Sequence, residues 1–154
     1  MVTPTIIANM GDGELGKSES IRMVYDKLCQ VAEGKPEHKD PNRENQKDVC
    51  AWLMINKVKV GIASDGDTQA IVRDNLDFLT DAKCQIILTA SRNNHDMVCL
   101  LNEYKNEYRI WRTSNAHLFE QNTNPRVAPK GLLDRFNEQW AEEIANLIES
   151  WCYA

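Results

Sequence analysis

Two strand patterns separated by only two residues place the tightest constraint on the fold of this chain. The segments 48–55 (DVCAWLMI) and 58–64 (VKVGIAS) are rich in apolar and β-branched residues, and only Asn56 and Lys57 lie between them. A two-residue connection allows an antiparallel hairpin, but it is too short for the helix that joins two parallel strands. Asn tolerates a positive φ, although Lys is a poor second turn residue, so we predict a hairpin here.

Outside this hairpin, strand and helix patterns alternate along the chain. The other predicted strands cover 4–10, 84–90 and 108–114. The predicted helices cover 17–33, 68–82, 97–104 and 131–151. Two polar segments without a period, 34–47 and 115–130, are predicted to be exposed loops. The sequence therefore predicts an α/β fold with three layers: a mostly parallel five-stranded sheet, covered by helices on both faces, with its second strand antiparallel and at an edge.

Composition and charge bound the class of protein. The 154 residues fit a single domain, 1–154, and the net charge of -5 gives no reason to expect a nucleic-acid partner. The five cysteines form no C-x-x-C pair, which argues against a zinc site and for a reducing compartment. There is no secretory signal pattern and no apolar run of membrane-spanning length. We therefore expect a soluble, cytoplasmic protein that does not bind membranes.

The segment 11–18 (GDGELGKS), between the first predicted strand and the first predicted helix, carries the strongest functional signal. It matches the pattern G-x-x-x-x-G-K-[ST]. Glycines let successive backbone N–H groups face a phosphate chain, and the helix N-terminus adds partial positive charge. The segment also spells G-x-G-x-x-G, the dinucleotide fingerprint, but the second predicted strand does not end in the acidic residue which that fingerprint requires. Lys17 and Ser18 would have no role in dinucleotide binding, so the sequence favours a phosphate loop.

On these residues the chain resembles the P-loop NTPase superfamily. The resemblance is specific over residues 11–18, and the hairpin at 48–64 is similar to the layout of Ras-like GTPases. It implies that Lys17 reaches the β- and γ-phosphates of a nucleoside triphosphate and that Ser18 places a hydroxyl on Mg²⁺. The implied nucleotide-binding residues are Gly11, Asp12, Gly13, Glu14, Leu15, Gly16, Lys17, Ser18 and Glu19.

The remainder of the implied site is less specific. P-loop enzymes place an Asp after a second buried strand to hold Mg²⁺, and Asp65 follows the strand at 58–64. Asp67, two residues later, is the other acidic residue of this turn. Either Asp67 or Thr68 suits the N-cap of the next helix, so Asp65 is the better metal candidate. Arg92 directly follows a predicted strand and is a candidate to neutralise charge on a transferring phosphoryl group. Arg43 and Arg126, in the two polar segments, are further candidates for that role.

Three functions are consistent with these residues. The first is a Mg²⁺-dependent ATPase or NTPase in which the segment 34–47 responds to nucleotide. The second is a small-molecule or nucleotide kinase, and the third is a regulatory module that binds nucleotide without turnover. The guanine-specificity motif of Ras-like GTPases is absent from the segments after the late strands, so ATP is the default nucleotide and GTP stays open. A protein partner or a homo-oligomer also stays open, since Trp151 lies close to the end of the chain.

Overall fold

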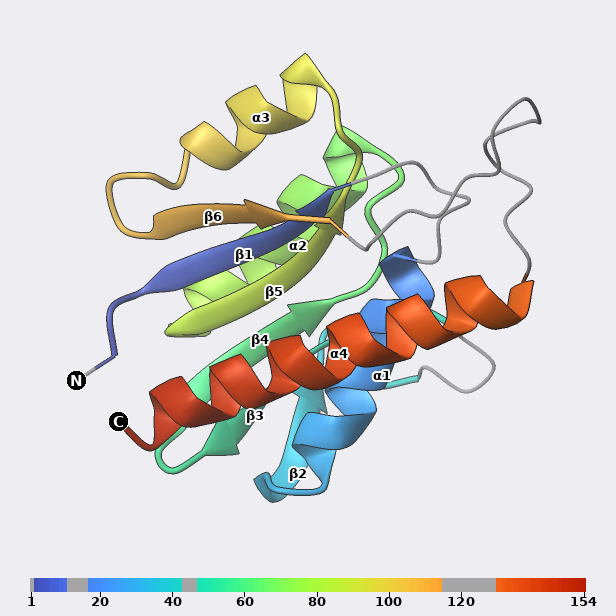
Figure 1. The fold of residues 1–154 in the computed structure, drawn as a ribbon. Helices are drawn as coiled ribbons and strands as arrows, with labels where there is room; N and C mark the ends of the chain where they lie inside the picture. Colours follow the sequence, from blue (N-terminus) through green and yellow to red (C-terminus); the bar gives the residue numbers. More distant parts are fainter. Residues whose placement is uncertain (1, 11–16, 43–46, 115–129) are drawn as a thin grey trace.

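The chain folds around one six-stranded mixed sheet with helices on both faces (Figure 1). The computed structural model describes residues 2–10, 17–42, 47–114 and 130–154. The strands are β1 (Thr5–Met10), β2 (Glu33–His38), β3 (Cys50–Ile55), β4 (Val58–Ala63), β5 (Ile86–Ser91) and β6 (Arg109–Thr113). The helices are α1 (Lys17–Cys29), α2 (Gln69–Asp81), α3 (His95–Asn102) and α4 (Lys130–Cys152). This α/β architecture agrees with the predicted fold class.

Parallel pairing dominates the centre of the sheet. The strand order is β2-β3-β4-β5-β1-β6, in which β5 pairs in parallel with both β1 and β4, and β1 pairs in parallel with β6. Every residue of β1 and of β5 is buried, as expected for parallel strands covered on both faces. Because these four strands run in the same direction, their carboxyl ends meet at one edge of the sheet (Figure 1).

The two faces of the sheet have separate cores. On one face α1 and α4 pack together, and Ile21, Val24 and Ile148 meet the side chains of the central strands there. On the other face α2 and α3 contribute Val72, Leu76 and other buried side chains to a second cluster. The three predicted layers are therefore present. Helices α1 and α2 bury the apolar side chains that their sequence pattern indicates, whereas large apolar side chains of α4, such as Trp140 and Ile144, stay half-buried.

The C-terminal helix α4 also contacts the edge strand β6. The rings of Trp111 and Trp151 meet edge to face with centroids 5.2 Å apart, and the guanidinium of Arg109 lies 4.3 Å from the centroid of the Trp111 ring. Trp151 is thus covered in part by its own chain. Within the described ranges, no helix combines the length and the apolar character that crossing a membrane requires.

The predicted hairpin is confirmed. Strands β3 and β4 pair antiparallel from Cys50 with Ala63 to Ile55 with Val58. Asn56 and Lys57 both have positive φ, 49° and 67°, as a two-residue turn that matches the strand twist requires. The side chain of Asn56 also donates from Nδ2 to the backbone oxygen of Cys152, 2.9 Å away, which ties the turn to the end of α4.

The segment 34–47 was wrongly predicted to be a loop throughout. Its first part belongs to β2, which pairs antiparallel with β3, and its residues 43–46 lie outside the described part of the chain. The strand forms at the sheet edge, where backbone hydrogen bonds to β3 suffice without apolar burial. The pairing is irregular between Glu33 and Glu37, where Gly34 has φ 73° and Pro36 has no N–H to donate.

This extra strand changes three further predictions. The sheet has six strands instead of five, and the antiparallel strand β3 is internal because β2 covers its outer side. Helix α1 ends at Cys29, earlier than predicted, because the chain must turn back to enter β2. The second predicted loop, 115–130, lies almost wholly outside the described residues.

The positive φ of Lys57 predicts that Lys57→Gly stabilises the protein. A residue with a Cβ atom in the left-handed region costs about 1 kcal/mol, which glycine avoids, although glycine also gains entropy in the unfolded chain. We expect a net gain of about 0.5 kcal/mol in the free energy of unfolding, measured by urea denaturation. Lys57→Ala keeps the Cβ atom and should not stabilise. Equal stabilisation by both variants would contradict the argument that the positive φ of Lys57 costs free energy.

Candidate functional site

The strand and the helix that a phosphate loop requires are both present. Strand β1 ends at Met10 and α1 begins at Lys17, so the segment 11–16 connects the buried centre of the sheet to a helix N-terminus. Residues Gly11 to Gly16 and the side chain of Lys17 lie outside the described part of the structure, as do Arg43 and Arg126. Ser18 is half-buried in the first turn of α1, and Glu19 beside it is exposed.

Asp65 lies in the loop 64–68, which leaves the carboxyl end of β4 and leads into α2. Its Oδ1 accepts a hydrogen bond from the backbone N of Asp67 at 3.1 Å. Thr68 caps α2, since its Oγ1 accepts from the backbone N of Ile71 at 3.2 Å, which confirms one of the two predicted caps. The carboxylate of Asp65 is therefore held by a tight turn at the edge where the parallel strands end.

The loop 64–68 lies directly against the end of β5. A Cβ atom on Gly66 would come within 2.4 Å of the backbone carbon of Ala90, so only glycine allows this approach. Arg92, which follows β5, donates from Nε to the backbone oxygen of Asp67 at 3.1 Å, and its guanidinium lies 3.5 Å from the carboxylate of the same residue. The structure thus places the side chain of Arg92 against the loop that carries Asp65.

Asp48, just before β3, is a candidate that the sequence analysis missed. Its Oδ1 accepts a hydrogen bond from the hydroxyl of Ser64 at 2.8 Å and lies 3.2 Å from Nη1 of Arg22. Ser64 is fully buried, and its Oγ also accepts from the backbone N of Val49 at 2.8 Å. These hydrogen bonds hold the start of β3 and the end of β4 together. Asp48 lies just before β3 and Asp65 just after β4, so each strand end carries one carboxylate.

Helix α1 connects this acidic edge with the phosphate-loop motif. Ser18 and Arg22 are four residues apart on α1, a spacing that places two side chains on the same face of a helix. Arg22 contacts Asp48, so Ser18 lies on the face of α1 that carries this contact. The motif and the two carboxylates therefore belong to one edge of the molecule.

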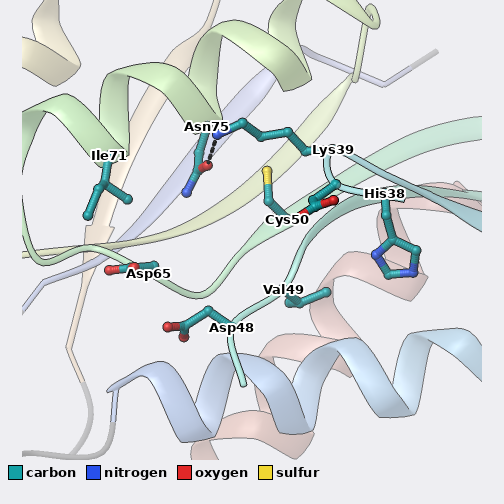
Figure 2. Close-up of a pocket in the computed structure, with 9 residues that line it drawn as sticks. His38, Lys39, Asp48, Val49, Cys50, Asp65, Ile71 and Asn75 are labelled. Atoms are coloured by element: carbon teal, nitrogen blue, oxygen red, sulfur yellow. Dashed lines mark hydrogen bonds between the residues drawn. The ribbon is translucent and has the colours of Figure 1, made fainter. Parts of the chain in front are cut away.

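A polar pocket, which we call the β2–β4 pocket, opens beside these carboxylates. It encloses about 390 Å³. Figure 2 shows its walls: the ends of β2 and β3 on one side, α2 above, and the carboxylates of Asp48 and Asp65 pointing to the same side. The lining residues are His38, Lys39, Asp40, Asp48, Val49, Cys50, Asp65, Ile71 and Asn75.

Lys39 and Asn75 join β2 to α2 across this pocket. Nζ of Lys39 donates to Oδ1 of Asn75 at 3.0 Å and forms an ion pair with Asp74. Asn75 is 5% exposed, although it lies on a helix whose other face is solvated. Sequence periodicity places Asn75 near the apolar stripe of α2, and this buried amide was the signal that could have marked the pocket.

Cys50 contributes a neutral thiol to the pocket. Burial raises the pKa of Cys50 to about 12, although the nearby ammonium of Lys39 acts in the opposite direction. Burial likewise raises the pKa of Cys84 to about 12 in the core under α2. Neither thiol is charged at neutral pH, so Cys50 lines the pocket as a small, weakly polar side chain and not as a nucleophile.

A second hollow, which we call the β1–β6 hollow, lies at the same edge of the sheet. It encloses about 620 Å³ and includes Met10, the last residue before the phosphate-loop motif. Its other lining residues are Asn93, Ile110, Trp111, Arg112, Thr113 and Ser114. The two hollows lie on either side of β5, and the motif begins at the second of them.

The donors at this edge suit a hard cation better than a transition metal. Within the described ranges, no cluster of three or more His, Cys, Asp or Glu side chains could hold a metal ion by itself. Mg²⁺ is commonly bound by one or two carboxylates together with substrate phosphates, and hydroxyl and carboxylate oxygens are its ligands. Ser18 and Asp65, the predicted ligands, and Asp48 fit that chemistry.

Comparisons of the chain with models of protein families, with curated proteins and with solved structures found no match.

The buried hydroxyl of Ser64 predicts a large effect of Ser64→Ala. The substitution leaves the buried N–H of Val49 without its acceptor and removes the donor to Asp48, at a cost of about 1–3 kcal/mol in the free energy of unfolding. Urea denaturation measures this change. Ser150→Ala, on the exposed face of α4, is the matched control and should cost less than about 0.5 kcal/mol. Equal effects at both sites would contradict the lock between β3 and β4.

The raised pKa of Cys50 predicts slow alkylation in the folded protein. At pH 8 only about one part in ten thousand of a thiol with a pKa near 12 is thiolate, so iodoacetamide should modify the exposed Cys99 well before Cys50. Raising the pH should speed modification of Cys50 about tenfold per unit. Mass spectrometry of peptides gives both rates. In urea the two cysteines should react alike, and similar rates in the native protein would refute the burial argument.

Proposed function

We propose that this protein is a P-loop nucleoside triphosphate-binding protein that hydrolyses its nucleotide with Mg²⁺, with ATP as the default nucleotide. The observation that carries the proposal is the position of the segment 11–18. It begins where a fully buried central strand ends, and its last two residues open a helix at the carboxyl edge of a parallel sheet. Ligands of open α/β sheets bind at that edge.

The residues of the motif have separate roles in this proposal. Backbone N–H groups of residues 11–16 surround the phosphate chain, and the N-terminus of α1 adds partial positive charge. Lys17 brings a point charge to the β- and γ-phosphates. Ser18 and Asp65 would hold Mg²⁺, which would supply positive charge against the negative charge that develops on the phosphates. Arg92, attached to the loop that carries Asp65, would neutralise charge on the transferring group.

The shape of the carboxyl edge supports a binding site larger than a phosphate loop alone. The β1–β6 hollow adjoins the start of the motif and offers apolar, aromatic and amide groups suitable for a nucleoside. The described lining residues of the two hollows include no Gln or Glu.

A phosphotransferase is the second candidate, and a specific observation favours it. The β2–β4 pocket holds polar groups from four elements and lies beside Asp65, where an acceptor molecule could approach a γ-phosphate. A kinase would show little turnover with nucleotide and Mg²⁺ alone and strong turnover when the right acceptor is added.

The proposal predicts that Lys17→Ala abolishes nucleotide binding. A ligand that binds only the folded state raises the thermal midpoint, so ATP and GTP with Mg²⁺ should each be tested for a shift in the unmodified protein. Lys17→Ala should remove any shift, because the phosphates lose their point charge. Lys27→Ala, at the exposed end of the same helix, is the matched control and should keep it. An unchanged shift in Lys17→Ala would overturn the phosphate-loop assignment.

Phosphate release then separates the functions. Release from nucleotide with Mg²⁺ alone supports the NTPase, and release that depends on an added acceptor supports the kinase. Nucleotide binding that needs Lys17 but leads to no turnover in either assay would identify a binding module and overturn both enzymatic assignments.

A further inference from the structure

We infer that β6 is a docking surface for a second copy of this chain, whose own β6 pairs with it antiparallel about a twofold axis. Strand β6 is the outermost strand of the sheet, beside β1 (Figure 1). Within the described ranges it pairs with no other strand. The inference is independent of the proposed nucleotide site, and it joins the sheets of two molecules into one.

The backbone of β6 presents hydrogen-bonding groups on its open side. The N–H of Arg109 donates to the backbone oxygen of Pro4 at 2.8 Å, so Arg109 turns its peptide groups toward β1. The residues of a strand alternate in this respect, so Ile110 and Arg112 turn their N–H and C=O groups away from β1. A row of such groups at a sheet edge is a template for another strand.

The β1–β6 hollow leaves room for that strand. It is lined by every residue from Ile110 to Ser114. Neighbouring side chains of a strand point to opposite faces, so a hollow that all of these residues line runs beside the strand and not over one face. Met10 ends β1 and Asn93 follows β5, so the part of the hollow nearest to the phosphate-loop motif is not needed for the pairing.

The two edges of the sheet differ in how they are protected. At the edge strand β2 the register shifts between Glu33 and Glu37, Gly34 has a φ of 73°, and Pro36 has no N–H to donate. Bulges and prolines of this kind hinder the addition of another strand. Strand β6 has neither: its register with β1 is unbroken and it contains no proline. The chain therefore blocks one edge and leaves the other regular.

Trp111 gives the regular edge an anchor. Its side chain is 42% exposed, although the indole is large and apolar. The ring is already held within the single chain, because it packs against Trp151 and lies under the guanidinium of Arg109. A side chain that is held before association loses little conformational entropy on association. Trp and Arg are also enriched in protein interfaces, so we expect Trp111 at the centre of the contact.

A twofold axis beside Trp111 satisfies the open backbone groups. Ile110 then lies opposite the partner's Arg112, and each of these residues exchanges both of its backbone hydrogen bonds with the partner. Trp111 lies opposite the partner's Trp111 in a non-hydrogen-bonded pair, the closer of the two kinds, where aromatic pairs are favourable. Arg109 falls opposite the partner's Thr113, so no arginine lies directly opposite another.

The neighbouring registers are less favourable. An axis beside Arg112 places two guanidinium groups directly opposite each other, and like charges in that position are destabilising. An axis beside Ile110 places Arg112 opposite the partner's Tyr108, and the N–H of Tyr108 already donates to the backbone oxygen of Tyr104 at 2.9 Å. The backbone and the charges therefore favour the register centred on Trp111.

The first experiment measures the mass of the protein in solution by sedimentation equilibrium, without nucleotide. The mass should rise with concentration toward that of two chains, with a dissociation constant on the order of 10 µM, because one strand pair is smaller than a standard interface. A mass of one chain at every concentration up to about 500 µM would overturn the second copy as the occupant and favour a strand of another protein.

Arg112→Pro tests the backbone pairing. It removes an N–H that points away from β1 and bonds to nothing within β1, so the fold should persist while the dimer weakens about tenfold or more. Arg112→Ala removes the same side chain but keeps the N–H, so it should dimerise at least as well as the unmodified protein. Circular dichroism shows whether both variants are folded. Equal dimerisation of the two variants would contradict the pairing of strands.

A disulfide trap tests the register and does not depend on the proline variant. In a Cys99→Ser background, which removes the exposed thiol, Trp111→Cys should link two copies on mild oxidation, because residues of a non-hydrogen-bonded pair lie close together. Thr113→Cys, on the same face of β6, is the matched control and should not link, since its counterpart lies too far along the partner strand. No link at Trp111, or an equal yield at both positions, would overturn the register.

Discussion

The placement of β5 between β1 and β4 is the constraint on which the rest of the structure depends. Its backbone pairs in parallel with both neighbours, and all of its side chains are buried between the two helical layers. Parallel pairing brings the carboxyl ends of these strands to one edge, so three loops that are far apart in the chain leave the sheet side by side. The two hollows and the candidate residues all lie at that edge as a consequence.

Close packing at the end of β5 fixes the position of the loop 64–68 at this edge. Gly66 lies so near to Ala90 that no side chain fits between them, and Arg92 donates a hydrogen bond to the backbone of the same loop. The carboxylate of Asp65 is therefore positioned by the core of the sheet and not by a loose surface turn. On the neighbouring strands, Ser64 gives the same rigidity to Asp48. Functional groups held in this way need little reorganisation when a ligand arrives.

The elements that could be predicted from sequence are those with a local signal. The apolar period of the helices, the unbroken apolar strand that became β5, and the short link at Asn56 and Lys57 each identified an element correctly. The capping role of Thr68 was one of two alternatives and was confirmed. Local chemistry sufficed in each case, because period, turn length and capping side chains act over a few residues.

The features that could not be predicted depend on partners distant in the chain. Strand β2 contains no large apolar residue, and it is stabilised by hydrogen bonds to β3 that its own sequence does not indicate. The sequence pattern indicates Asp48 only as the first residue of a strand, because its partners Arg22 and Ser64 lie 26 and 16 residues away. The pocket between β2 and α2 was hidden for the same reason, since Lys39 and Asn75 meet only in the folded chain.

The bond from Asn56 to the backbone of Cys152 has a consequence for how this protein tolerates change. It fastens the hairpin turn to the C-terminal helix at the edge of the sheet opposite to the candidate site. One edge of the sheet thus carries a contact that links the hairpin to α4, and the opposite edge carries the candidate site residues. Variation at the closing edge would show itself as altered abundance and lifetime of the protein, whereas variation at the other edge would change which molecules it handles while the fold persists.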